Sequence, residues 1–166
     1  MIFVTVGTNE ARFERLVEAA GRIPPGEEMV VQTGHCLAAP SRATCVDFLP
    51  FEEMVEHARR ARVVVSHAGV GSIMLALMAG RRPVVVPRIA ALGEAVDDHQ
   101  VPLARRLDAA GLVRLVEDPA DLAAAVAEGG SREPMRTGEG TDLARELHAY
   151  LRAVVPLPFG GAPHGV

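Results

Sequence analysis

The sequence lacks a long hydrophobic run. Its longest apolar stretches, such as residues 63–65 and 83–87, are far shorter than the roughly 20 apolar residues of a membrane-spanning helix. Residues 1–7 also lack the basic start, the apolar stretch and the small-residue cleavage site of a signal peptide. We therefore expect a cytoplasmic protein that does not cross a membrane by itself.

An excess of basic charge and a cysteine framework are also missing. The chain has 17 basic and 21 acidic residues, which gives a formal net charge of -4. Without a global basic field it is not expected to bind nucleic acid, and any anionic ligand must be held locally. The two cysteines, Cys36 and Cys45, have neither a second pair nor the histidine spacing of a zinc site, so we expect reduced thiols.

The composition and the order of the segments indicate one packed α/β domain. The 166 residues are 49% hydrophobic and 23% charged, which is typical of a globular domain. Short β-branched runs alternate with stretches of helical periodicity, and the runs are apolar throughout, as in strands covered on both faces. These patterns predict a doubly wound, mainly parallel, Rossmann-like sheet. The expected strands are 2–6, 29–32, 44–46, 63–66, 84–86 and 112–115, and the expected helices are 10–20, 51–60, 70–79, 97–110 and 120–127.

The chain is expected to have four parts. Residues 1–128 form the ligand-binding domain, and residues 129–140 form a flexible linker because they are polar and rich in glycine. Apolar residues recur on one face of an amphipathic helix at 141–154, which must pack on this domain or on a partner. Residues 155–166, rich in glycine and proline, form a loose tail.

Three loops follow strands of the predicted sheet and are the first candidates for a binding site, because ligands bind at the carboxyl ends of parallel strands. They comprise residues 7–9, 67–72 and 88–100. In the second loop, Gly69 and Gly71 allow close backbone approach and Ser72 adds a hydroxyl at the start of a helix. Free amides and the helix dipole make such a turn an anion site suited to a diphosphate. The alternative is that the glycines only permit a tight turn.

Other motifs are less well matched. No Gly-Lys-Ser/Thr follows the turn, and Met74 stands where a dinucleotide fingerprint has its third glycine. A hydrolase built from Ser72, Asp98 and His99 lacks the Gly-x-Ser-x-Gly elbow. A metal site could be built from His99 with Glu94, Asp97 and Asp98. Their spacing supports such a site poorly, so no metal is expected.

Several side chains beside the turn could contact a sugar or a nucleoside. Asp98 and Gln100 suit the hydroxyls of a sugar or a ribose. The alternative is that Asp97 and Asp98 only stabilise the start of a helix. His67 ends a strand where no aliphatic residue is needed, which favours ligand contact over a core role. Residues 45–53, with Phe48-Leu49-Pro50-Phe51, offer an apolar surface for a base, and core packing of Phe48 and Phe51 is the alternative.

The candidate residues stand in longer motifs, which read Phe3-Val4-Thr5-Val6-Gly7-Thr8, Asp47-Phe48-Leu49-Pro50-Phe51-Glu52-Glu53-Met54, Ser66-His67-Ala68-Gly69-Val70-Gly71-Ser72-Ile73-Met74, and Val86-Pro87-Arg88 with Gly93-Glu94-Ala95-Val96-Asp97-Asp98-His99-Gln100. Together these motifs resemble the C-terminal domain of family 28 glycosyltransferases. The resemblance spans residues 1–116 and extends to short bacterial exopolysaccharide subunits and to the catalytic subunit of the two-component dolichol-linked N-acetylglucosamine transferase.

This resemblance implies a single GT-B half-domain that binds a UDP-sugar without a cofactor. Many relatives carry a ribose-binding Glu where this chain has Leu75. The implied contacts are Gly7, Thr8, Gly69, Val70, Gly71 and Ser72 for the diphosphate, Phe48 and Leu49 for the uracil, Arg88 for the charge on the departing UDP, and Glu94, Asp98, His99 and Gln100 for the sugar or ribose.

The implied activity is inverting glycosyl transfer for exopolysaccharide or lipid-linked glycan synthesis. The catalytic base and the lipid-linked acceptor are expected on a separate, membrane-associated subunit, which would hold this chain at the cytoplasmic face of the membrane. The alternatives are a non-catalytic nucleotide-binding subunit, a scaffold subunit of a polysaccharide complex, and a self-sufficient homodimer.

Overall fold

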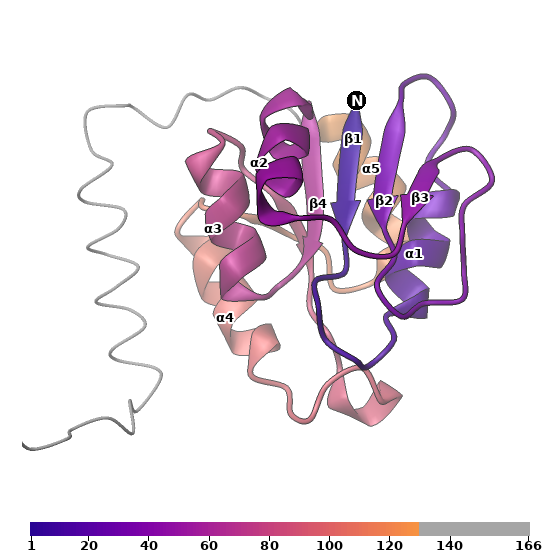
Figure 1. Cartoon of the computed structure of the whole chain (residues 1–166). Coiled ribbons are helices and arrows are strands. Elements are labelled where there is room, and N and C mark those ends of the chain that lie inside the picture. The colour runs from indigo at the N-terminus through magenta and orange to yellow at the C-terminus, as the bar shows by residue number, and fades with distance from the viewer. Residues whose placement is uncertain (130–166) are drawn as a thin grey trace, which may run out of the picture. The chain divides into compact units, whose positions relative to one another are not determined.

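A six-stranded, all-parallel sheet runs through the computed structural model, which describes residues 1–129 (Figure 1). Its strand order is β3-β2-β1-β4-β5-β6, so the direction of winding reverses between β1 and β4. The strands are β1 (Ile2–Thr5), β2 (Met29–Gln32), β3 (Thr44–Val46), β4 (Val63–His67), β5 (Val84–Val86) and β6 (Arg114–Leu115). Except for residue 129, the predicted linker lies outside the described residues, as do the predicted helix at 141–154 and the tail.

Helices cover both faces of this sheet, which confirms the predicted doubly wound architecture. In Figure 1, α1 and α5 lie on one side of the strands and α2 and α3 on the other. The helices are α1 (Glu14–Gly21), α2 (Phe51–Arg60), α3 (Val70–Met78), α4 (Gln100–Ala109) and α5 (Leu122–Glu128), with 3-10 turns η1 (Ala90–Leu92) and η2 (Pro119–Asp121). None of the helices in residues 1–129 has the length and apolarity needed to span a membrane.

The core consists of two apolar layers, one on each face of the sheet. Alternate residues of β1 point to opposite layers, so Val4 packs with Leu16 of α1 while Phe3 packs with Leu75 of α3. All four residues of β1 are buried, and so are the first four of β4. This double burial explains why the strands are uninterrupted β-branched runs.

Helix starts differ most from the sequence-based expectation. Helix α1 begins at Glu14 rather than at residue 10, and α4 begins at Gln100 rather than at residue 97. In both places a side chain bonds to a nearby amide: Asn9 accepts from Ala11 at 2.8 Å, and Asp97 accepts from His99 at 3.1 Å. Such local bonds compete with the helical backbone pattern and extend the loops.

Candidate functional site

The loops after β1, β4 and β5 meet at the carboxyl end of the sheet, which is the lower end in Figure 1. The strands that precede these loops are direct neighbours, because β1 pairs with β4 and β4 pairs with β5. In open parallel sheets, ligands commonly bind at the carboxyl edge beside such a reversal of winding. The three predicted site loops are therefore brought together by the fold.

The turn between β4 and α3 presents free backbone amides. Gly69 caps α3 without any side-chain acceptor, and the first turn contains no acidic residue. The first helical bond runs from the amide of Ile73 to the carbonyl of Gly69, at 3.1 Å. The amides of the three residues before Ile73 have no intrahelical acceptor, so this end of α3 can bind an anion.

His67 fills the space between two of the predicted glycines. A Cβ on Gly7 would lie 2.4 Å from the His67 ring, and one on Gly69 would lie 2.1 Å from it. Gly7 also has a φ of 77°, which side chains rarely adopt. Both positions therefore require glycine. The His67 ring packs against both glycines and so connects the β1 loop with the turn after β4.

The environment of His67 favours its neutral form. Burial, and secondarily the positive charge of Arg88, lower the pKa of His67 from 6.5 to about 4. The residue as a whole is only partly buried, but its Nδ1 atom is enclosed. At neutral pH, His67 is therefore an uncharged group beside the glycine turn.

Two glycine substitutions in this turn are predicted to have opposite effects. Gly69→Ala is expected to lower the free energy of unfolding by about 1–3 kcal/mol, because its Cβ would overlap the enclosed His67 ring. Gly71→Ala is expected to leave it unchanged or to raise it by up to about 1 kcal/mol, because Gly71 lies in the helix and no atom lies within 4 Å of the added Cβ. Denaturant unfolding of both variants checks this, and equal effects would contradict the role of His67.

Arg88 lies inside the protein, which differs from its predicted contact with the departing UDP. Its side chain is completely buried. The guanidinium donates to the carbonyl groups of Val6 at 2.8 Å, Ala11 at 2.7 Å and Glu94 at 2.9 Å. Burial lowers the pKa of Arg88 below its ordinary value. Arg88 thus connects the loop after β1 with the loop after β5. Because the guanidinium is buried, its charge can act on a ligand only through space and not by direct contact.

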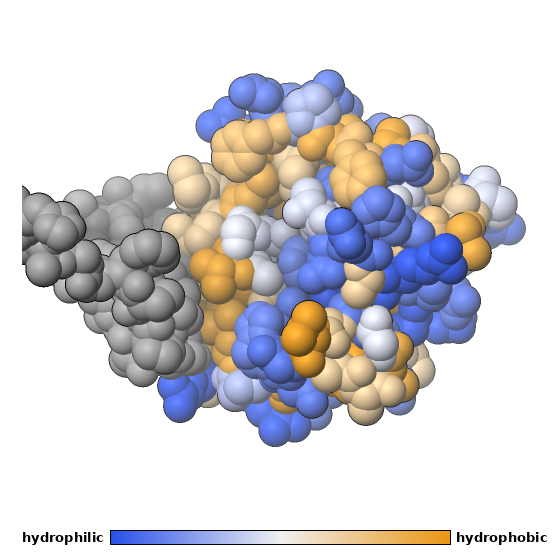
Figure 2. All heavy atoms as spheres, turned by 60° about the horizontal axis from the view of Figure 1, so that its bottom comes forward, coloured by the Kyte–Doolittle hydropathy of each residue, from blue (hydrophilic) through white to orange (hydrophobic). Residues whose placement is uncertain are grey.

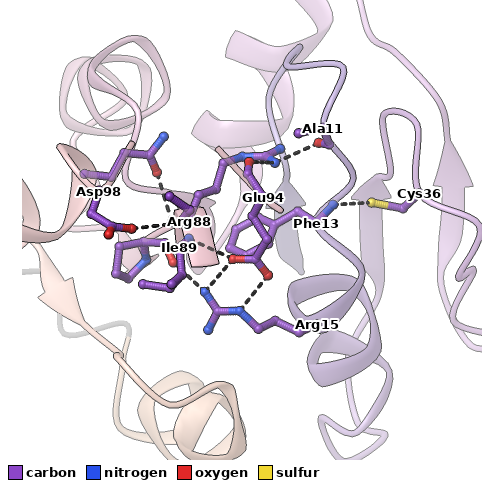
Figure 3. A network of polar contacts seen from close by, with 11 residues as sticks. Ala11, Phe13, Arg15, Cys36, Arg88, Ile89, Glu94 and Asp98 are labelled. Atoms are coloured by element: carbon purple, nitrogen blue, oxygen red, sulfur yellow. Dashed lines mark hydrogen bonds and ion pairs between the residues drawn. The ribbon is translucent and has the colours of Figure 1, made fainter. Parts of the chain in front are cut away.

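Glu94 is also inside, and its carboxylate is already occupied (Figure 3). Arg15 donates to both carboxylate oxygens, at 2.7 and 2.9 Å, and the amide of Ile89 donates to one of them at 2.9 Å. The predicted contact of Glu94 with a sugar would compete with these three bonds. Arg15 itself was not predicted, because nothing in its local sequence pairs it with a loop 79 residues away.

The other polar residues of this loop also contact the loop's own backbone. Asp98 accepts from the amide of Ala90 at 2.7 Å, and Gln100 accepts from the amide of Arg88 at 3.2 Å. Gln100 is buried, whereas Asp98 and His99 are exposed, and Nδ1 of His99 contacts the Asp97 carboxylate. Asp98 and His99 remain accessible to a ligand at this edge.

The predicted base-binding segment is accessible in part. Phe48 is 46% exposed and contacts His35 edge to face, with ring centroids 5.2 Å apart, whereas Leu49 packs against the core. His35 follows β2 and was not predicted. Thr8 and Gly71 are exposed, Val70 is half-buried and Ser72 is buried. Figure 2, which is turned toward the lower end of Figure 1, shows hydrophobic and hydrophilic residues intermixed on this side.

Residues 1–129 bring no three His, Cys, Asp or Glu side chains together as metal ligands. The absence of a metal requirement stays a prediction.

Known proteins are similar to this chain in sequence and in fold. Residues 1–140 match the glycosyltransferase family 28 C-terminal domain. A stretch of 56 residues is 38% identical to the UDP-N-acetylglucosamine transferase subunit ALG13 of Yarrowia lipolytica (strain CLIB 122 / E 150), covering 34% of this chain and 26% of that protein.

Solved structures share the fold. The glycotransferase of kitacinnamycin superimposes with a TM-score of 0.64 at 25% identity, over 92% of this chain and 41% of that one. CalG4, the calicheamicin glycosyltransferase, gives a TM-score of 0.60 at 21% identity, over 93% and 44%. MurG of Acinetobacter baumannii gives 0.51 at 21% identity, over 75% and 40%. The chain thus spans less than half the length of each of these proteins, and the predicted GT-B half-domain fold is confirmed.

Proposed function

Because the chain belongs to the glycosyltransferase family 28 C-terminal domain, we propose that it binds the UDP-sugar donor of a glycosyltransferase and that a second polypeptide binds the acceptor. The name of the ALG13 relative, a UDP-N-acetylglucosamine transferase subunit, supports both the donor class and the division into subunits. The chain is then one half of a GT-B enzyme, active in exopolysaccharide or lipid-linked glycan synthesis.

The Gly69 turn is the observation that carries this proposal. It combines uncapped amides, an exposed Gly71 and no competing carboxylate in the first helical turn. A diphosphate matches such a turn because several amides can donate to one anion while the helix dipole offsets its charge. The positive charge of Arg88, which is buried beneath the surface of these loops, adds an electrostatic potential that favours an anion at the turn.

The remaining contacts follow from what is exposed at the same edge. Phe48 and His35 offer aromatic surface for the uracil. Asp98 and His99 can reach hydroxyl groups of the sugar or the ribose, and Thr8 can reach the diphosphate. The transfer is inverting and independent of metal, with the diphosphate charge offset at the turn and the acceptor deprotonated by a base on the partner. The isolated chain is accordingly expected to be inactive, and turnover by it alone would contradict the two-subunit arrangement.

Calorimetric titration of the purified chain with UDP tests the donor assignment, with Gly71→Ala as the informative variant. That variant is expected to fold at least as well as the unaltered chain, because its Cβ meets no protein atom. It is nevertheless expected to lose on the order of tenfold or more in UDP affinity, because the Cβ would occupy the space through which the diphosphate reaches the amides.

Two controls belong to this titration. ADP and GDP are expected to bind more weakly than UDP if the base is recognised, and Ser72→Ala tests whether the hydroxyl of this buried residue contributes. UDP binding that is equal in the unaltered chain and in Gly71→Ala would exclude the turn as the diphosphate site. Absence of binding to any nucleotide by the unaltered chain would count against the donor role of the isolated domain.

One observation favours a second candidate, a non-catalytic nucleotide-binding subunit. Leu75, which stands where many relatives have a ribose-binding Glu, is only 6% exposed and packs in the core with Phe3 and Val64. Helix α3 therefore offers no carboxylate for the ribose at this position. Turnover after addition of the acceptor-binding subunit would eliminate this candidate.

A further inference from the structure

Arg15 and Glu94 form an ion pair that makes no direct contribution to the proposed donor contacts. Nε and Nη2 of Arg15 donate to the two carboxylate oxygens at 2.7 and 2.9 Å, and Nη2 also donates to the carbonyl of Pro87 at 2.6 Å. The two side chains are 22% and 7% exposed. A bidentate pair shielded in this way is strong and costly to break, because loss of one partner leaves the other charge uncompensated.

The pair connects two segments that are far apart in sequence. Arg15 lies in the first turn of α1, directly after the β1 loop, whereas Glu94 lies in the loop between β5 and α4. Arg88 connects the same two segments from inside the protein, because its Nη1 donates both to the carbonyl of Ala11 in the β1 loop and to the carbonyl of Glu94. Glu94 is thus held through its side chain by one arginine and through its backbone by another (Figure 3).

Phe13 keeps the two arginines in place. Its ring lies between them, with the Cζ atom of Arg15 at 5.2 Å from the ring centroid and that of Arg88 at 4.7 Å. The ring is completely buried, so movement of either guanidinium away from it would leave part of its apolar surface uncovered. Both cations are therefore fixed by an aromatic face on one side and by oxygen acceptors on the other.

The carboxylate of Glu94 also shapes its own loop. It accepts from the amide of Ile89, and the next amide, that of Ala90, donates to Asp98. Asp98 is one of the exposed residues proposed to contact the donor. A change in the position of Glu94 would thus be passed to Asp98 through two consecutive backbone amides.

We propose that Arg15 and Glu94 are positioning residues that hold the β1 loop and the β5–α4 loop in the conformation that binds the donor. This inference rests on the proposed function for the identity of the ligand. The coupling of the two loops itself rests only on the contacts described above.

Hydrogen exchange and UDP titration of an Arg15→Met variant test this role. The expected result is that the amides of Ile89 and Ala90 exchange at least about tenfold faster, while the central strands exchange as before. UDP affinity is expected to fall on the order of tenfold, because the loop is no longer preorganised. Arg15→Lys, which keeps one bond to Glu94, is expected to restore part of both effects. Arg114→Met is the matched control, since Arg114 pairs with Glu128 at 2.6 Å on the surface.

Each outcome decides the inference. Faster exchange confined to residues 87–99 and to the β1 loop, together with weaker UDP binding, supports it if Arg15→Lys partly recovers both effects. Unchanged exchange or unchanged UDP affinity in Arg15→Met overturns it, and so does faster exchange throughout the sheet, which would mean that the pair only stabilises the fold. If the unaltered chain binds no UDP, the proposed function fails, and the exchange rates still decide whether the pair couples the loops.

Discussion

Replacement of Arg88 by methionine is expected to lower the free energy of unfolding by about 3 kcal/mol, the range in which loss of a buried polar network falls. The side chain donates to three buried or half-buried carbonyl groups, and methionine can satisfy none of them. Removal of the charge relieves its own desolvation, but the orphaned carbonyl groups remain. Methionine keeps the aliphatic part of the side chain but ends before the guanidinium group, so a cavity adds to the effect of the lost bonds.

Denaturant unfolding at neutral pH measures this effect, with two further variants as references. Arg88→Lys keeps the charge but lacks the planar group that reaches several acceptors, so it is expected to be destabilised to an intermediate degree. Arg105→Met removes an exposed arginine that pairs with Glu117 on the surface and is expected to leave the midpoint unchanged. A midpoint for Arg88→Met equal to that of Arg105→Met would show that the buried network contributes little.

Acidification is expected to destabilise the chain through His67. The pKa of His67 in the folded chain is about 4, below its ordinary value of 6.5. Between these two values the unfolded chain binds more protons than the folded one, so stability decreases as the pH falls through this window. The contribution of His67 is fully present above pH 6.5 and is mostly lost near pH 4. From pH 7 to pH 4.5 the expected loss is about 2–3 kcal/mol.

The His67→Gln variant isolates this contribution from that of the carboxylates. Glutamine is uncharged at every pH, so the variant should lose about 2–3 kcal/mol less than the unaltered chain over the same interval. Carboxylates such as Glu27, whose pKa is lowered to about 2 mainly by its hydrogen bond to Arg62, affect both proteins alike. Parallel stability curves for the two proteins would show that the ring is not held neutral by the fold.

Much of the fold could be predicted from the sequence because its elements are determined locally. Strands β2, β3 and β5 and helix α2 have the predicted bounds, since β-branched runs and a proline at residue 50 define them within a few residues. Helix starts at α1 and α4 were predicted too early. There, single Asn and Asp side chains compete with the helical backbone, and periodicity does not reveal which of the two prevails.

The sequence by itself determined the doubly wound sheet, the glycine turn and the family, because these depend on hydrophobic periodicity and on residues that are adjacent in the chain. Only the tertiary structure decided the positions of the buried charges. Arg88 and Glu94 stand in polar loops that suggest contact with a ligand, yet both are buried. Their partners, Ala11 and Arg15, are more than 70 residues away, and such pairs exist only after the sheet has brought the β1 loop against the β5–α4 loop.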